Sequence, residues 1–208
     1  VTGRDGGGVY QIGNATSETP NVKGRLQIDA GAGSDKLIYD NQIDAAERTG
    51  KLTGSTITGF DMAEEGVTYS GFEELILILG SGVDKLSLES DFSGTTLIQT
   101  GGGRDEVKIE KYFGEMIVET GEESDTIRIF DGNEDEIGLN AQLTIDGGAA
   151  GDNYIVTVVD EVVGNSFLQL SDSGVDGLDT LTYNGSDGDD LIQLDTVYDR
   201  NRDSSREF

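Results

Sequence analysis

The stretch LIQTGGGRDEVKIEKYFGEMIVETGEESDTIRI, from Leu97 to Ile129, contains two copies of one unit. Each copy has a segment of alternating apolar and polar residues, a turn that starts on glycine and closes on aspartate, and a second alternating segment. The turns run from Gly101 to Asp105 and from Gly121 to Asp125, so the copies lie 20 residues apart. A period this short accommodates two strands and two turns, and it is too short for a pair of helices.

The alternation around the turns predicts which side chains are buried. The second and fourth residues after a turn aspartate are apolar in three units: Leu86, Leu88, Val107, Ile109, Ile127 and Ile129. Because successive side chains of a strand point to opposite faces, one face is expected to be buried and the other solvated. Stacked coils of about 20 residues then form an all-β β-solenoid of the β-roll or β-helix kind. An antiparallel β-sandwich of hairpins is the alternative, since it also has frequent glycine-rich turns.

The recurrence of the unit sets the expected domain boundaries. Residues 1–25 are glycine-rich and polar, and we expect an irregular extension there, then a β-repeat domain over 26–200 and a charged tail over 201–208. LQIDAGAGSDKLIY at residue 26 matches LTIDGGAAGDNYIV at residue 143. This match indicates a longer unit of about 115 residues over 26–142 and a partial second copy over 143–200. Residues 40–66 break the pattern and predict an inserted loop or hairpin, with a short helix from Asn41 to Lys51 as a further option.

The composition excludes several functional classes. Asp and Glu number 41 against 14 Lys and Arg, for a formal net charge of −27, which argues against binding to nucleic acid or to anionic membranes. Cys and His are absent, so there is no disulfide framework, no thiolate zinc site and no imidazole base. No apolar run is long enough to insert in a membrane. Because a signal peptide and an initiating Met are both missing, we expect a processed product or a piece of a longer chain.

The aspartates that close the turns are the candidate metal ligands. In stacked coils they would lie about 5 Å apart and repel one another by about 1–3 kcal/mol per pair. A bound Ca²⁺ would remove this cost, because Ca²⁺ takes carboxylate and carbonyl oxygens in flexible geometry. The other interpretation is that each aspartate caps its turn without metal, with Lys36, Lys85 and Arg104 neutralising the neighbouring carboxylates. The candidate ligands are Asp35, Asp84, Asp105, Asp125, Asp152, Asp187 and Asp189.

Three turns resemble a known calcium-binding motif. The segments Gly-Ala-Gly-Ser-Asp-Lys-Leu37, Gly-Ser-Gly-Val-Asp-Lys-Leu86 and Gly-Gly-Gly-Arg-Asp-Glu-Val107 resemble the RTX (hemolysin-type) repeat, and most closely its degenerate form in large secreted bacterial-type surface repeat proteins. The resemblance implies a secreted parallel β-roll with Ca²⁺ between successive turns, held by the aspartate carboxylates and glycine carbonyls. RTX repeats follow one another every nine residues, whereas the units here recur about every 20.

The remaining motifs indicate a non-enzymatic, extracellular protein. Asn14 and Asn184 begin glycosylation sequons, although Asn184-Gly185 also fits a plain turn. The sequence has no P-loop, nucleophile elbow or dinucleotide-binding fingerprint. We therefore expect a structural or adhesive repeat module of a fibre, stalk or surface array, whose partners are copies of itself, neighbouring repeats end to end, or glycans. The alternative is a Ca²⁺-binding accessory module of a secreted polysaccharide-acting enzyme.

Overall fold

The chain forms two sheets, β-strand accounts for 51% of it, and the residues that the structure describes contain no helix. The computed structural model describes residues 1–3, 6–13, 16, 22–130, 136–137, 140–157, 166–174 and 176–185. The all-β prediction is therefore confirmed. Among the described residues, no helix has the length and apolarity needed to cross a membrane.

Seven strands form the first sheet, which we call the seven-stranded sheet. Its order is β1-β3-β7-β9-β11-β14-β16, and every pairing in it is parallel. The strands are β1 (Val9–Gly13), β3 (Lys36–Asp40), β7 (Glu74–Ile78), β9 (Thr95–Gln99), β11 (Glu115–Glu119), β14 (Gln142–Asp146) and β16 (Phe167–Ser171).

The second sheet, the ten-stranded sheet, has the order β17-β15-β12-β10-β8-β4-β5-β6-β2, with β13 paired to β10. Its strands are β2 (Leu26–Asp29), β4 (Arg48–Thr53), β5 (Thr56–Gly59), β6 (Val67–Ser70), β8 (Asp84–Glu89), β10 (Glu106–Tyr112), β12 (Thr126–Ile129), β13 (Glu136–Ile137), β15 (Asn153–Thr157) and β17 (Thr180–Asn184). Antiparallel pairing occurs among the described strands only at β4–β5 and β5–β6, so the antiparallel sandwich does not describe the chain as a whole.

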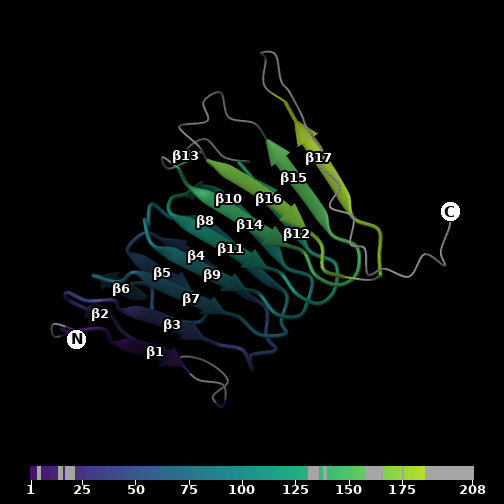
Figure 1. Ribbon diagram of the computed structural model, residues 1–208. Coiled ribbons are helices and arrows are strands. Elements are labelled where there is room, and N and C mark those ends of the chain that lie inside the picture. Colours follow the sequence, from purple (N-terminus) through teal and green to yellow (C-terminus); the bar gives the residue numbers. More distant parts are fainter. Residues whose placement is uncertain are drawn as a thin grey trace.

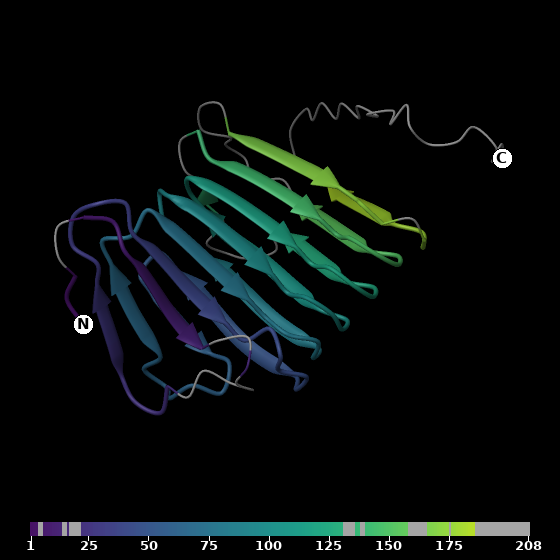
Figure 2. The ribbon, with the colours of Figure 1, turned by 60° about the horizontal axis from the view of Figure 1, so that its bottom comes forward.

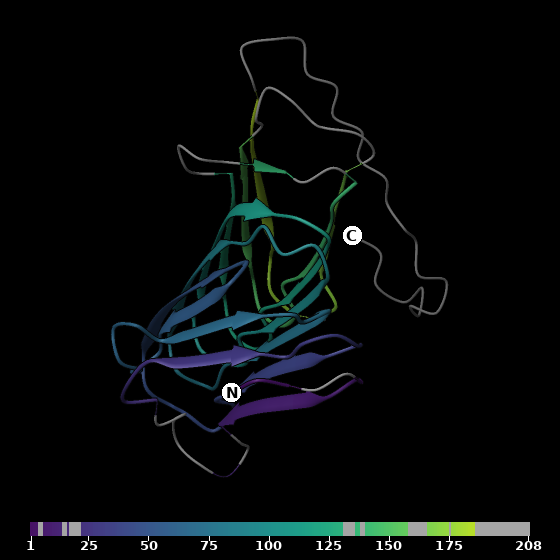
Figure 3. The ribbon, with the colours of Figure 1, turned by 90° about the vertical axis from the view of Figure 1, so that its left-hand side faces the viewer.

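From β7 onwards the chain alternates between the sheets, apart from the short strand β13. β7, β9, β11, β14 and β16 lie in one sheet, while β8, β10, β12, β15 and β17 follow them in the other. Figure 1 shows the strands from β7 onwards stacked in chain order towards the yellow-green end, and Figure 3 shows the sheets as two facing layers. Equivalent residues on neighbouring strands of the ten-stranded sheet are 21, 20, 27 and 27 residues apart, so the coil length is less uniform than the predicted 20.

The core lies between the sheets and consists of columns of apolar side chains. The six residues predicted to be buried after the turn aspartates are at most 2% exposed, and Leu77, Ile98 and Val118 face them from the other sheet at 2%, 0% and 0%. The intervening residues, such as Lys85 and Lys108, are exposed or half-buried. The predicted alternation is therefore confirmed, and apolar burial on the inner face holds the two sheets together.

The irregular segments differ in part from the expectations. The N-terminal extension contains the strand β1, which completes one edge of the seven-stranded sheet. Residues 40–66 form the predicted hairpin, β4 with β5, and the helical option is wrong because Arg48–Thr53 pairs with β8 as a strand. The two matching segments of the longer repeat lie in different sheets, since β2 belongs to the ten-stranded sheet and β14 to the seven-stranded one. The tail over 201–208 lies outside the described residues.

Candidate functional site

Four of the candidate ligands form a row along one edge of the molecule. Asp84, Asp105, Asp125 and Asp152, here called the aspartate ladder, each stand where the chain leaves a turn and enters the ten-stranded sheet. Figure 2 shows these turns aligned along one side of the stack. Their side chains are buried, with exposures of 3%, 3%, 2% and 1%. Buried carboxylates are uncommon, so their partners decide what the row can do.

Backbone hydrogen bonds link each aspartate to the turn before it. The Oδ1 atom of Asp84 accepts the N–H of Arg48 at 2.8 Å, and Oδ1 of Asp105 accepts the N–H of Asp84 at 2.7 Å. Asp125 and Asp152 repeat the contact with the N–H groups of Asp105 and Asp125, at 2.8 Å each. The ladder therefore caps successive turns, which is the metal-free role weighed from the sequence. The assignment of these aspartates as metal ligands stays a prediction.

The second carboxylate oxygens have a different environment. Oδ2 of Asp105, Asp125 and Asp152 is buried without a hydrogen-bond partner among the described residues. Burial, which disfavours the charged form, raises the pKa of Asp84, Asp105 and Asp125 to about 7, and it also raises the pKa of Asp152. Neighbouring aspartates of the ladder raise these values further. The row therefore favours protonated carboxyl groups below neutral pH.

The flanking cations pair with other acids. Lys36 Nζ lies 2.8 Å from Glu74, and Lys85 Nζ lies 4.0 Å from Glu47. None of the ion pairs between described residues includes an aspartate of the ladder. The expectation that Lys36 and Lys85 neutralise the adjacent turn aspartates is therefore wrong, because in a strand adjacent side chains point to opposite faces.

Threonine hydroxyls accompany the ladder in two turns. Thr100 Oγ1 donates to the carbonyl of Thr120 at 2.9 Å, and Thr120 Oγ1 donates to the carbonyl of Gly147 at 2.8 Å. These two threonines lie one position past the ends of β9 and β11, which are neighbours in the seven-stranded sheet.

The last described turn adds two aspartates that were not among the predicted ligands. Asp179 continues the ladder, because its Oδ1 accepts the N–H of Asp152 at 3.0 Å. Burial and contact with Asp179 raise the pKa of Asp172 to about 6, and the same contact lowers the pKa of Asp179. The sequence contained a signal for Asp179, since Leu181 and Tyr183 follow it at the second and fourth positions, as in the other units. Asp172 has no such signal.

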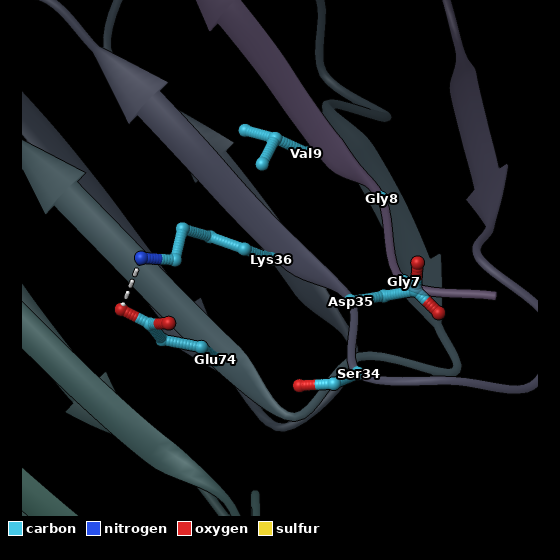
Figure 4. Close-up of a pocket in the computed structure, with 7 residues that line it drawn as sticks. All are labelled: Gly7, Gly8, Val9, Ser34, Asp35, Lys36 and Glu74. Carbon is cyan, nitrogen blue, oxygen red and sulfur yellow. Dashed lines mark ion pairs between the residues drawn. The ribbon is translucent and has the colours of Figure 1, made fainter.

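Asp35 is separated from the ladder. It precedes β3 in the seven-stranded sheet, whereas the ladder aspartates stand at the start of strands of the ten-stranded sheet. Asp35 is 1% exposed, and neither of its carboxylate oxygens has a hydrogen-bond partner among the described residues. It lines a hollow of about 350 Å³ beside β1, where the Lys36–Glu74 ion pair lies on the opposite side from the Asp35 carboxylate (Figure 4).

The other predicted site residues lie at the ends of the described chain. Asp187, Asp189 and Asn14 fall outside the described residues. Asn184 ends β17, is exposed, and donates from Nδ2 to Thr157 Oγ1 at 3.3 Å. The predicted glycosylation of Asn14 and Asn184 stays a prediction.

Comparisons with known proteins add no family to this description. No protein-family model matches the chain, and neither a curated protein nor a solved structure matches it.

Proposed function

We propose that the chain is a β-solenoid that serves as a non-enzymatic structural module, a segment of an extracellular or cell-surface rod, stalk or fibre. In this proposal the two sheets are opposite walls of one coil, and the coils stack end to end. The observation that carries it is the in-register stacking of β7 to β17, which ends on open strands. Among the described residues, β16 and β17 are each paired on one side only. An open strand edge is a template for further pairing.

The side chains at this end support the same proposal. Tyr154 is 4% exposed, whereas Leu181, the next residue of the same core column, is 50% exposed. Phe167 at 53% and Leu178 at 83% are also exposed at this end. Burying such apolar surface would be worth about 25 cal/mol per Å². A further coil, from a neighbouring repeat or a second copy, would cover Leu181 and pair with β17.

The chemistry of the described residues supports a structural role more than a catalytic one. The hollow beside β1 contains one ion pair and one buried carboxylate, and these groups do not form a nucleophile and base. The ladder carboxylates face backbone N–H groups in the stack. The extracellular location is proposed from the strong acidity and from the resemblance to secreted repeat proteins.

End-to-end association can be tested in solution with one substitution at the open end. Leu181→Lys places a charge in the column that a further coil would cover, while costing little in the single chain because Leu181 is half exposed. We expect the parent chain to form concentration-dependent assemblies by light scattering and electron microscopy, and we expect Leu181→Lys to abolish them.

Thr182→Lys is the matched control, because Thr182 is an exposed neighbour on the same strand that faces away from the core column. It adds the same charge, and assembly should persist. A parent chain that remains monomeric at the highest concentrations it tolerates, at high and low salt, would refute end-to-end association. Equal loss of assembly in both variants would mean that the added charge, and not its position in the core column, prevents assembly.

A further inference from the structure

Three carboxylates converge where the last described turn lies on the turn before it. Asp152 closes the turn between β14 and β15, and Asp172 and Asp179 begin and end the turn between β16 and β17. One carboxylate oxygen from each of the three residues lies within 4.8 Å of the others. Asp152 is buried, whereas Asp172 and Asp179 are exposed. The group therefore has one interior member and two members open to solvent.

The register of the seven-stranded sheet explains why Asp172 is there. The residue after each strand forms one column, and the column contains Thr100, Thr120, Gly147 and Asp172 in successive coils. Thr100 and Thr120 carry hydroxyls that donate hydrogen bonds, and Gly147 has no side chain. At Asp172 the column places a second carboxylate beside the ladder, and this acceptor needs a cation or a proton.

Asp152 supplies an independent indication of a ligand. Its side chain is 1% exposed, and its Oδ2 has no hydrogen-bond partner among the described residues, although its Oδ1 accepts the N–H of Asp125. A Cβ on Gly147 would lie 2.4 Å from this Oδ2 and 2.1 Å from the Tyr154 hydroxyl, so the glycine lets both groups approach its backbone. No ion pair between described residues involves Asp152, Asp172 or Asp179. A buried, unpaired carboxylate oxygen is costly unless a ligand satisfies it.

We propose that Asp152, Asp172 and Asp179 form a binding site for one divalent cation of the Ca²⁺ type. The donors are all carboxylate oxygens, which suit a hard cation, and the sequence has no Cys or His to favour a transition metal. Ca²⁺ binds carboxylate oxygens at about 2.4 Å, so oxygens that lie within 4.8 Å of one another can share one ion. Because Asp172 and Asp179 are exposed, water completes the coordination. Asp172 and Asp179 lie outside the glycine-rich turns that suggested calcium from the sequence.

The site differs from the rest of the ladder in what it connects. A hydrogen bond from N–H to Oδ1 joins every pair of turns from Asp84 to Asp179, and the carboxyl groups of the earlier turns are buried. At the last described turn the cation would join three side chains from two successive coils. Its binding would therefore stabilise the docking of β16 and β17 on β14 and β15.

Calcium titration of the whole chain tests the proposal. Binding is measured by isothermal titration calorimetry in about 0.15 M NaCl, because salt at this concentration screens weak binding of Ca²⁺ to the acidic surface. Tb³⁺ serves as a second probe, since Tyr154 Oη and Asp152 Oδ2 lie on the same side of Gly147, and the tyrosine can sensitise lanthanide emission. We expect one tight site in the parent chain, with the affinity reduced on the order of tenfold or more in Asp172→Asn and in Asp179→Asn.

Asp176→Asn is the matched control, because Asp176 is an exposed aspartate of the same turn that is not a member of the group. It removes one charge from the turn and should leave Ca²⁺ affinity and Tb³⁺ emission nearly unchanged. Circular dichroism confirms that each variant is folded. Equal weakening in all three variants, or Tb³⁺ emission that persists in Asp172→Asn, would overturn the assignment. A parent chain with no site above the background of the Asp172→Asn chain would overturn it as well.

Discussion

Asp105→Asn is the substitution that most directly tests the aspartate ladder. The amide keeps an oxygen that can accept the N–H of Asp84, and it removes the charge of a side chain that is 3% exposed. Its NH₂ group would occupy the position of Oδ2, which is buried and has no hydrogen-bond partner among the described residues. The substitution therefore removes a buried charge and retains the cap.

The pKa of Asp105 sets the size of the effect. Burial raises it from 3.8 to about 7, with Asp125 and Glu123 adding to the rise and the N–H of Asp84 opposing it. Since one pH unit of pKa difference is worth ~1.4 kcal/mol, ionised Asp105 costs the folded state up to roughly 4 kcal/mol above pH 7. Asn removes this cost, but burying its NH₂ group costs free energy and offsets part of the gain. We expect a net stabilisation of about 2 kcal/mol at pH 8, which raises the melting temperature by about 4–8 °C.

The assay is thermal unfolding at pH 8 and at pH 5.5, followed by circular dichroism. At pH 5.5 folded Asp105 is protonated, and the remaining cost of roughly 2 kcal/mol is that of protonating a carboxyl group that is ionised in the unfolded chain, so the net gain from the amide should nearly disappear. Asp105→Ala leaves the N–H of Asp84 unpaired, and it should lose about 1–3 kcal/mol at pH 5.5. Glu122→Gln removes one charge at an exposed position in the next turn, and it should change the melting temperature little at either pH. Equal destabilisation by the Asn and Ala variants at pH 8 would refute the reasoning.

Further predictions concern the whole ladder, the core and one turn. The melting temperature of the parent chain should fall as pH rises from 5.5 to 8. In this window unfolded aspartates are already ionised, whereas the ladder carboxyl groups of the folded chain, with pKa values of about 7, are only then losing their protons. A rise in melting temperature over this window would contradict the prediction. Ile109→Ala should cost about 2–5 kcal/mol in denaturant unfolding, whereas Val83→Ala, at an exposed position, should cost little. Gly121→Ala should be destabilising, because Gly121 has φ 97° and an added Cβ would lie 2.0 Å from the Gly101 carbonyl oxygen. Gly102→Ala is the tolerated control, because the nearest atom to its Cβ would be 3.6 Å away. Equal melting temperatures of the two variants would contradict the prediction.

The regular part of the fold could be predicted because its signal is local. Alternation around the turns identified the buried residues of β8, β10 and β12, since a strand carries its period of two in consecutive residues. The sheet to which a strand belongs is not a local property. Asp35 looked like the other turn aspartates, yet the hairpin of β4 and β5 changes the alternation of sheets between it and Asp84.

The candidate site shows the same limit. Asp179 repeats the local pattern of the units, but Asp172 enters the site only through its register with Gly147 and Thr120. That register depends on links of different length, which place equivalent residues 20 residues apart in one coil and 27 in the next. A motif defined by fixed spacing cannot find such a residue. The burial of the ladder likewise depends on contacts between coils and not on the turn sequence alone.

The direction of the hydrogen bonds between coils has a mechanical consequence. In the parallel sheets these bonds run along the stack, so a pulling force applied between its two ends loads them in tension, one coil at a time. Each ladder aspartate adds one bond per coil to the backbone pairs that resist the force. A coil of 20 residues would release about 70 Å of chain and a coil of 27 about 90 Å. Stretching single molecules should therefore give two step lengths, with the longer steps arising from the coils of Asp152 and Asp179, and steps of one length would contradict this.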